Sequence, residues 1–247
     1  MPRTGAEPGM SGILFIISAP SGSGKTTLVD ALRQYVPKLD FSISYTTRSP
    51  RGSEQDGREY HFIPLTRFEE MIQNGEFLEY AQVFNNYYGT ASRVLQDAAR
   101  REHDLLLDID VQGARQVKQK IPEAVSIFVL PPSRAELESR LRKRSRSENV
   151  VSEEVIDRRL AAARKEIENY PNYDYILIND RLEQSVDDLQ AIVLGERIER
   201  SGKPPSPQEK QYLETARKCL KPEMKTKIRS ILASFDLPPP AQSDSLR

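Results

Sequence analysis

A glycine-rich segment near the amino terminus, SAPSGSGKTT at residues 18–27, carries the residue types that bind phosphate. Gly24, Lys25 and Thr26 end the pattern G-x-x-x-x-G-K-[ST], in which backbone N–H groups cradle phosphates and the hydroxyl ligates Mg²⁺. Ala19 replaces the first glycine of that pattern, at a position that needs only a tight turn with negative φ. We therefore predict an ATP-binding loop. Its expected contacts come from Ala19, Pro20, Ser21, Gly22, Ser23, Gly24, Lys25, Thr26 and Thr27.

A second segment, RSPR at residues 48–51, predicts a site for another phosphate. The proline favours extended backbone with about three residues per turn, so Arg48 and Arg51 are expected to project from the same side. Two guanidinium groups aimed at one point can bind a phosphate, and Tyr60 and Tyr88 can each add a hydroxyl donor. An R-x-x-R by itself is more often a solvated basic loop, so the neighbouring segments must decide.

Two further segments carry charged residues at informative spacings. In DLLLDID, the period of two in a strand places Asp108 and Asp110 on one face, at the end of a strand where α/β folds bind ligands. In RLRKR, Arg140 and Arg144 are one helical turn apart and can therefore face one ligand. Taken alone, RLRKR also fits a solvated or RNA-binding basic helix.

The elements that must hold these residues alternate between strands and helices. Leu28, Leu32 and Val36 recur at helical spacing directly after the glycine-rich segment, and Pro37 closes that helix. Such alternation predicts an α/β fold with a mostly parallel sheet covered on both faces. The expected core strands are ILFIIS at 13–18, DLLLDID at 104–110, AVSIFVL at 124–130 and DYILIND at 174–180.

Composition sets further bounds. The 247 residues include 36 basic and 36 acidic side chains, which argues against a chain devoted to nucleic acid or an anionic membrane. Cys219 is the only cysteine, so an intrachain disulfide or a cysteine metal cluster is not expected, and two histidines do not favour a histidine-rich metal site. The amino terminus lacks an apolar signal core, and the run Ile13–Ile17 is too short to span a bilayer, so we expect a soluble, cytoplasmic protein.

Several segments together resemble the guanylate kinases, in order and at family spacing. They are SAPSGSGKTT, SISYTTRSPR, GREYHF, GEFLEYAQVFNNYYGT and LLLDIDVQGA, with IFVLPPS, RLRKR and NYDYILIND extending the resemblance to about residue 199 of 247. The acceptor-site segments are specific to this family among P-loop kinases. Bacterial members often carry SAPSG, so Ala19 is consistent with the resemblance.

The resemblance implies an α/β P-loop nucleoside-monophosphate kinase with a mostly parallel sheet, an inserted α+β GMP-binding unit and a helical lid. The kinase-like domain is expected at 12–202, after a disordered lead-in at 1–11. Its expected parts are a core at 12–41, 97–139 and 167–202, an insert at 42–96 and a lid at 140–166.

The implied activity is phosphorylation of GMP to GDP by direct transfer from ATP with Mg²⁺, in purine nucleotide metabolism. The resemblance implies dGMP as a second acceptor. By position, Ser44, Glu79, Thr90 and Asp108 would surround the guanine, and Arg48, Arg51, Tyr60 and Tyr88 would hold the GMP phosphate. Thr26 and Asp110 would lie at the metal, and Asn179 beside the adenine. The expected catalytic residues are Lys25, Arg48, Arg140, Arg144, Arg159 and Asp110.

Chemistry supports these assignments. A carboxylate such as Glu79 can accept from guanine N1–H and its 2-amino group together, whereas adenine would leave that carboxylate unpaired. Such a pocket can reject the wrong base by roughly 10⁴. Because the second pKa of a phosphate monoester is about 6, GMP needs no strong general base, and the transition state needs positioning and positive charge instead.

Two other functions compete with this reading. A scaffold module of the same fold would bind proteins through a decayed nucleotide site, but Lys25, Thr26, Arg48, Arg51 and Glu79 are all present. A P-loop kinase for a sugar phosphate would have no need of Ser44 and Glu79. In the lid, SRSENVVSEE is a few residues longer than the family pattern, which leaves the lid kinetics open.

The last part of the chain, 203–247, lies outside the resemblance. KPPSP at 203–207 predicts a stiff linker, and DLPPPAQSDSLR a disordered tail. Between them we expect two short amphipathic helices that form a cap on the kinase core; a dimer contact, or a basic surface for an acidic partner or RNA, are the alternatives, and the oligomeric state is not fixed. The apolar positions are Tyr212, Leu213, Ala216, Cys219 and Leu220, then Met224, Ile228, Ile231, Leu232 and Phe235.

Overall fold

The computed structural model describes residues 12–83, 85–147 and 152–240, and the chain divides into two compact units. Unit 1 consists of Met1–Ile16 and Lys38–Val125, and unit 2 consists of Ile17–Pro37 and Ser126–Arg247. The predicted lead-in at 1–11 and the last residues of the predicted tail, 241–247, lie outside the described residues, as do 148–151 of the predicted lid.

The larger sheet has five strands in the order β2-β7-β1-β8-β9. Within unit 1, β2 pairs with β7 in parallel, with Leu39 opposite Asp104; within unit 2, β8 pairs with β9 in parallel, with Ile127 opposite Tyr175. These strands are short apolar runs buried on both faces, as parallel strands require. The α/β class with a mostly parallel sheet is thereby confirmed. The bounds are β1 Leu14–Ser18, β2 Leu39–Phe41, β7 Asp104–Asp108, β8 Val125–Leu130 and β9 Tyr175–Ile178.

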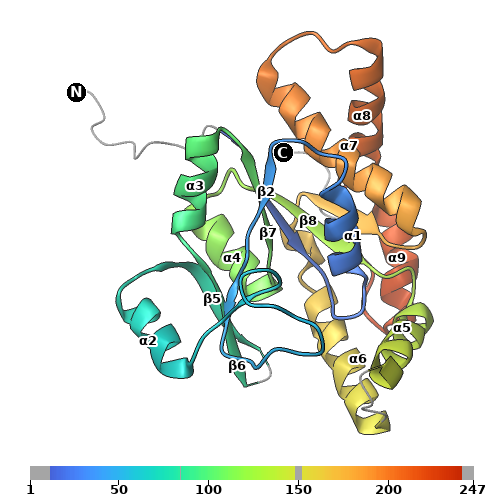
Figure 1. The fold of residues 1–247 in the computed structure, drawn as a ribbon. Coiled ribbons are helices and arrows are strands. Elements are labelled where there is room, and N and C mark those ends of the chain that lie inside the picture. Colours follow the sequence, from blue (N-terminus) through green and yellow to red (C-terminus); the bar gives the residue numbers. More distant parts are fainter. Residues whose placement is uncertain (1–11, 84, 148–151, 241–247) are drawn as a thin grey trace. The chain divides into compact units, whose positions relative to one another are not determined.

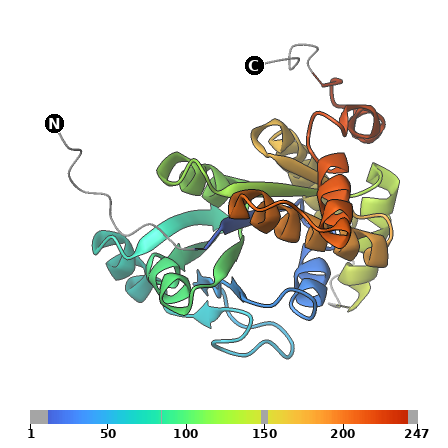
Figure 2. The ribbon, with the colours of Figure 1, turned by 90° about the horizontal axis from the view of Figure 1, so that it is seen from above.

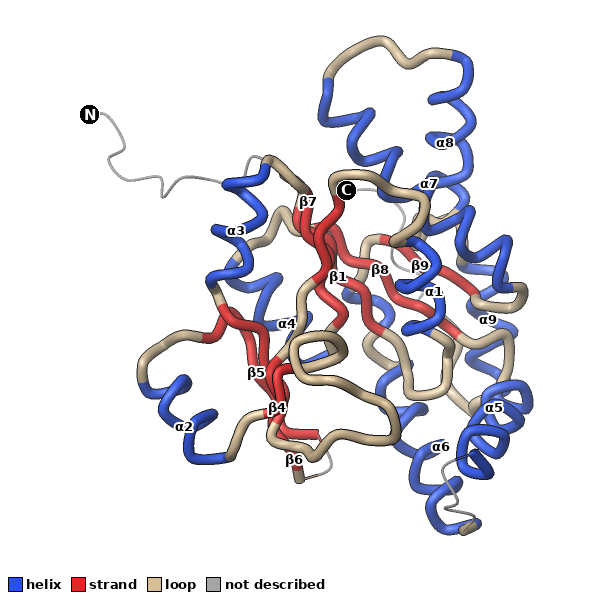
Figure 3. The backbone as a smooth tube through the Cα atoms, viewed as in Figure 1, coloured by secondary structure: helices blue, strands red, loops and turns tan. Residues whose placement is uncertain are grey.

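Unit 1 also contains a smaller sheet in the order β4-β3-β6-β5, in which β5 and β6 form an antiparallel pair (Figure 3). Its core includes Phe68, Met71, Phe77 and Ala91, and the rings of Phe68 and Phe77 stack with centroids 4.5 Å apart. Of the residues that the resemblance assigns to the acceptor, this sheet holds Glu79, Tyr88 and Thr90, and Asp108 ends β7 of the larger sheet. The bounds are β3 Tyr45–Thr46, β4 His61–Phe62, β5 Phe77–Val83, β6 Asn86–Ala91 and α2 Leu65–Gln73.

The remaining helices of unit 1 are α3 Arg93–Arg101 and α4 Val111–Lys120 (Figure 1). Unit 2 contains α1 Lys25–Leu32, α5 Arg134–Ser147, α6 Glu153–Ile167, the 3₁₀ helix η1 Tyr170–Asn172, α7 Leu182–Ser201, α8 Pro207–Lys218 and α9 Lys225–Ser234. Helix α8 runs beside α7 in both Figure 1 and Figure 2. Across the described ranges, we find no helix that combines the length and the apolar character needed to cross a membrane.

Candidate active site

The glycine-rich loop lies between buried strand β1 and helix α1. Gly24 is the N-cap residue of α1 and has φ of 87°, and Gly22 has φ of 91°, a left-handed conformation that favours glycine. A Cβ at position 24 would lie 2.3 Å from the side-chain amide nitrogen of Asn179, and one at position 22 would lie 2.9 Å from Leu141. Both glycines are therefore required by shape as well as by backbone conformation.

The loop backbone is held by side chains from distant parts of unit 2. Asn179, which follows β9 and is only 5% exposed, donates from Nδ2 to the carbonyl oxygen of Ser23 at 2.7 Å. Arg140 of α5 approaches the same carbonyl at 3.5 Å and also donates to Glu136 at 2.8 Å. This arrangement gives Asn179 a role in shaping the loop, while the adenine contact that the resemblance implies stays a prediction.

A carboxylate of the chain already occupies one of the loop N–H groups expected to bind phosphate. The N–H of Ser21 donates to Oε2 of Glu166, on α6, at 3.3 Å. Acceptance of a backbone N–H by an anionic oxygen is what a phosphate would do at this position. Sequence reasoning missed Glu166, because nothing in its local sequence connects it with a segment 145 residues away.

The other donor-side residues also belong to unit 2. Lys25 is half-buried, and Thr26 is exposed in the first turn of α1, as phosphate and Mg²⁺ binding at a helix N-terminus require. Arg159 of α6 lies 3.5 Å from the hydroxyl of Ser145 on α5, so it bridges the two helices of the predicted lid. Arg144 is exposed on α5. The structure thus brings Arg140 to the loop and Arg159 to α5.

In unit 1, three residues predicted at the guanine come together on the smaller sheet. The hydroxyls of Ser44 and Thr90 are 3.3 Å apart, and Thr90 is the register partner of Glu79 across β5 and β6. All three side chains are buried, with Glu79 only 4% exposed. A Cβ at Gly113, in α4, would lie 2.4 Å from Oε2 of Glu79, so glycine is needed there for the carboxylate to fit.

The surroundings of Glu79 change its acidity. Burial raises its pKa to about 7, and the negative charge of Asp110 adds to the rise. Hydrogen bonding from Thr90 and the positive charge of Lys120 act in the opposite direction. A buried carboxyl of this kind needs hydrogen-bond donors to be stable as an anion, and guanine supplies two.

The predicted phosphate clamp centres on Arg48. Its guanidinium forms a two-point ion pair with Glu54, at 2.7 Å and 3.0 Å, and lies over the ring of Tyr60 at 5.2 Å. The ring of Tyr60 packs edge-on against that of Tyr88, with centroids 5.8 Å apart. The hydrogen bonds to Glu54 hold the pKa of Arg48 well above its ordinary value, and the pair lowers the pKa of Glu54.

Arg51 differs from this expectation. Arg48 is 8% exposed, whereas Arg51 is exposed to solvent. The two arginines therefore differ in burial, which the sequence pattern did not predict. Arg51 instead donates its backbone N–H to Oε2 of Glu54 at 2.7 Å. Glu54 therefore accepts from the guanidinium of Arg48 and from the backbone of Arg51. The signal for Glu54 was local: an acidic residue three positions after Arg51, directly after the segment Pro-Arg-Gly-Ser.

The two predicted aspartates lie at the end of β7 and at the start of α4. Strand β7 ends at Asp108, and Asp110 is the N-cap of α4, where Oδ1 accepts from Gly113 N at 2.8 Å and Oδ2 from Gln112 at 3.3 Å. Asp108 and Asp110 are both partly exposed on either side of the buried Ile109, as a period of two requires, and Asp110 keeps an extended backbone while it caps α4. The negative charge of Asp110 also acts on Glu79, whose pKa it raises.

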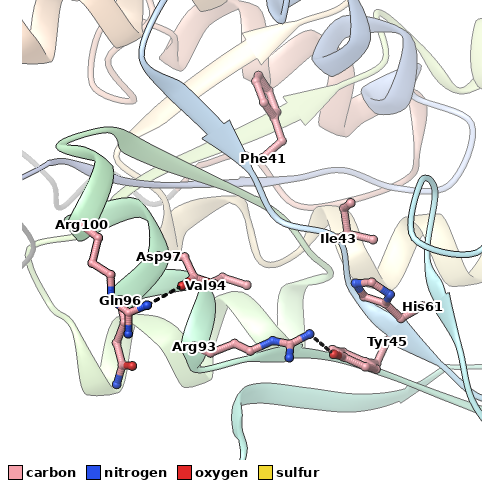
Figure 4. A pocket seen from close by; sticks show the side chains of 9 residues that line it. All are labelled: Phe41, Ile43, Tyr45, His61, Arg93, Val94, Gln96, Asp97 and Arg100. Carbon is pink, nitrogen blue, oxygen red and sulfur yellow. Dashed lines mark hydrogen bonds and ion pairs between the residues drawn. The ribbon is translucent and has the colours of Figure 1, made fainter.

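Unit 1 also has a cavity of about 490 Å³ beside α3 (Figure 4). One side carries the rings of Tyr45 and His61, with centroids 4.7 Å apart, and the other carries Arg93, Asp97 and Arg100 of α3. Figure 4 shows Arg93 directed at the hydroxyl of Tyr45. None of the predicted site residues lines this cavity, so it is separate from the acceptor groups described above.

A glycine-rich loop between a buried strand and a helix, in an α/β fold with a mostly parallel sheet, defines the P-loop class of nucleotide-binding proteins. The guanylate kinase family model matches residues 11–196. The chain therefore belongs to the guanylate kinase family, as its motifs suggested.

Individual relatives agree with this family. A guanylate kinase of Koribacter versatilis (strain Ellin345) is 56% identical over 226 residues, which cover 92% of this chain and 97% of the relative. A guanylate kinase of Nitrosospira multiformis is 51% identical over 187 residues, covering 76% of this chain and 87% of the relative. The crystal structure of guanylate kinase from Anaplasma phagocytophilum matches with a TM-score of 0.61 and 31% identity, over 76% of this chain and 87% of that chain.

Proposed function

We propose that this chain transfers the γ-phosphoryl group of ATP to GMP, and to dGMP, and that it does so in the cytoplasm. The observation that carries the acceptor assignment is the buried carboxyl of Glu79, paired across the sheet with Thr90 and close to Gly113. A buried carboxyl with this high pKa calls for a ligand that offers adjacent N–H donors, and the guanine edge does so.

On the acceptor side, unit 1 binds and orients GMP. Glu79 accepts from guanine N1–H and the 2-amino group, with Ser44, Thr90 and Asp108 completing the base site. Arg48 and Arg51 bind the phosphate together with the hydroxyls of Tyr60 and Tyr88, and that phosphate replaces the carboxylate of Glu54.

On the donor side, the loop of unit 2 binds ATP. Backbone N–H groups from Ser21 to Lys25 bind the β-phosphate, which displaces Glu166 from Ser21, and Lys25 binds the β- and γ-phosphates. Asn179 keeps the loop in shape through its hydrogen bond to Ser23. By its position in the family pattern, it also contacts the adenine.

Phosphoryl transfer then depends on positive charge rather than on a base. GMP is largely a dianion at neutral pH, because its second phosphate pKa is about 6. A GMP phosphate oxygen attacks the γ-phosphorus in line, and the bond to the β-phosphate oxygen of ADP breaks. Lys25, Arg48, Arg140, Arg144 and Arg159 offset the charge on the transferring oxygens.

Mg²⁺ is the metal that the donor chemistry supports. Thr26 offers an exposed hydroxyl at the start of α1, and Asp110 offers carboxylate oxygens. Hard oxygen ligands with several retained waters suit Mg²⁺, which when bound neutralises charge on the β- and γ-phosphates.

The test is product analysis after mixing the purified chain with ATP, Mg²⁺ and GMP. We expect ADP and GDP to form in equal amounts, and neither to form when a chelator removes Mg²⁺. A Lys25→Ala variant, measured under the same conditions, serves as the negative control. ADP formation without GDP, or GDP formation at a near-wild-type rate in the variant, would overturn the proposal.

A further inference from the structure

The residues that follow the family match form a structured arm. Residues 203–240, here the C-terminal arm, contain helices α8 and α9 and lie beyond residue 196, where the family model ends. The arm packs through apolar side chains, and even Leu237, at the start of the segment predicted to be disordered, is 8% exposed. The buried apolar residues of the arm are Ala216, Cys219, Met224, Ile228, Ile231, Leu232, Phe235 and Leu237.

The first anchor of the arm is the sheet edge at β9. Leu220 forms an antiparallel bridge with Tyr175, the N–H of Ile176 donates to the carbonyl of Cys219 at 2.8 Å, and Lys221 N donates to the carbonyl of Asp174 at 3.1 Å. Strand β9 stands last in the strand order, so these bonds satisfy backbone groups that an edge strand would otherwise leave unpaired.

The second anchor is helix α7, beside which α8 runs. The approach is close at Gly195, where an added Cβ would lie 3.1 Å from the Cβ of Ala216. Helix α8 starts at a defined point because Ser206 and Glu209 form a capping box and Pro207 is its first residue. The apolar stripes of the arm are thus covered within the chain, which removes the main reason to expect a dimer contact there.

The third anchor joins the arm to α5 and α6. The backbone N–H of Arg134, the first residue of α5, donates to the hydroxyl of Ser234 at 3.0 Å. That hydroxyl donates to the carbonyl of Ile231 at 2.7 Å, so it keeps lone pairs with which to accept. On α6, Arg164 donates to the carbonyl of Asp236 at 2.9 Å.

These contacts matter because α5 and α6 carry Arg140 and Arg159, two of the expected catalytic arginines. The first N–H groups of a helix have no partner within the helix, so Ser234 supplies α5 with a cap from the far end of the chain. Arg140 follows Arg134 by six residues, about 9 Å along a rigid helix, so a change at the start of α5 alters where Arg140 lies. Arg159 precedes Arg164 on α6 by five residues.

We infer that the C-terminal arm positions α5 and α6, with Ser234 and Asp236 as its contact points, so that their arginines reach the transferring phosphoryl group. The inference rests on the proposed function. An arm that served only to cover apolar surface would dock through its apolar face and would not need either hydrogen bond. Ser234 is accordingly a positioning residue, since it acts through Arg140 and not on the substrate.

The test compares Ser234→Ala with Ser230→Ala in the full chain. Ser230 lies one turn earlier on α9 and makes the same kind of bond, to the carbonyl of Lys227 at 2.8 Å, but the structure gives it no bond to α5. Subtracting the Ser230→Ala effect therefore isolates the contact with α5. The parallel pair on α6 is Arg164→Gln with Lys165→Gln as its control.

We expect the amides in the first turn of α5 to exchange with deuterium about fivefold faster in Ser234→Ala than in Ser230→Ala. We expect kcat to fall about threefold with the KM for GMP unchanged, because GMP binds unit 1, and Ser234→Thr to restore both values. Arg164→Gln should lower kcat in the same way, relative to Lys165→Gln.

Equal α5 exchange and equal kcat in the Ser234→Ala and Ser230→Ala proteins would overturn the inference. So would a lower kcat that Ser234→Thr fails to restore. If the wild-type chain made no GDP, the proposed function would fail while the α5 exchange measurement still tested the anchor, so the two failures are distinguishable.

Discussion

The side-chain amide of Asn179 donates a 2.7 Å hydrogen bond to the backbone carbonyl of Ser23, inside the glycine-rich loop. Both residues are buried, and Gly24 leaves the space that the amide occupies. The loop conformation therefore depends on a residue 156 positions away in the sequence. This relationship leads to the first prediction.

Replacing Asn179 with Ala should raise the KM for ATP about tenfold, because the Ser23 carbonyl loses its buried donor and the loop relaxes. GMP affinity, measured by calorimetry without ATP, should not change. Asn172→Ala is the control, since it removes an asparagine from η1 at an exposed position. An unchanged KM for ATP would show that Asn179 does not shape the loop.

Lys25→Ala should lower kcat by about 10²–10³, because it removes positive charge from the transferring phosphoryl group. The circular dichroism spectrum should match that of the wild type, as a half-buried lysine contributes little packing. Lys203→Ala, at an exposed position in the linker, controls for the loss of one lysine. Near-wild-type turnover in Lys25→Ala would contradict the donor-site assignment.

Glu79 should make stability depend on pH in a defined window. Its folded-state pKa of about 7 lies above the ordinary 4.5, so the folded chain binds more protons than the unfolded chain between these values. The free energy of unfolding should therefore fall as pH rises from 4.5 to 7, by on the order of 3 kcal/mol, and level off above. Urea unfolding of wild type and Glu79→Gln at pH 5, 6, 7 and 8 measures this, and a parallel pH profile in the two proteins would refute it.

The same carboxyl should make guanine binding depend on pH. Ionised Glu79 accepts both N–H donors of guanine, so guanosine, which lacks a titrating phosphate, should bind more tightly at pH 8 than at pH 6. Glu79→Gln should weaken binding at both values and remove the difference, whereas Glu76→Gln, a partly exposed neighbour, should keep it. Guanosine affinity that is the same at pH 6 and pH 8 in the wild type would count against this role.

Arg48→Lys should raise the KM for GMP by about tenfold or more, because lysine keeps the charge but loses the planar two-point contact now made with Glu54. The KM for ATP should stay the same. Arg58→Lys is the matched control, as its side chain is 71% exposed and pairs with Glu59. Equal weakening of ATP and GMP binding would indicate a general effect on folding instead.

Much of the fold could be predicted because the signals are local. The apolar runs that form β1 and β8, and the glycine-rich turn into α1, are short segments whose character does not depend on distant residues. The class of fold follows from their alternation. The capping role of Asp110 could not be predicted in this way, because a helix cap and a strand end have similar sequences and the backbone decides between them.

The details of the site were harder to predict because they are tertiary. Glu166 reaches Ser21 only after α6 has packed, and the unequal exposure of Arg48 and Arg51 depends on the rings that surround Arg48. Charge patterns in a sequence show which side chains can bind phosphate. They do not show which carboxylates of the chain already occupy those groups in the folded protein.

The most direct measurement compares kcat/KM for GMP with that for AMP, CMP and UMP, with ATP and Mg²⁺ held at saturation. We expect a preference for GMP over AMP of roughly 10⁴, because AMP leaves the buried Glu79 carboxylate without its two donors. The preference should collapse in Glu79→Gln, mainly through loss of GMP turnover. Comparable kcat/KM values for GMP and AMP in the wild-type protein would contradict the assignment of the acceptor site.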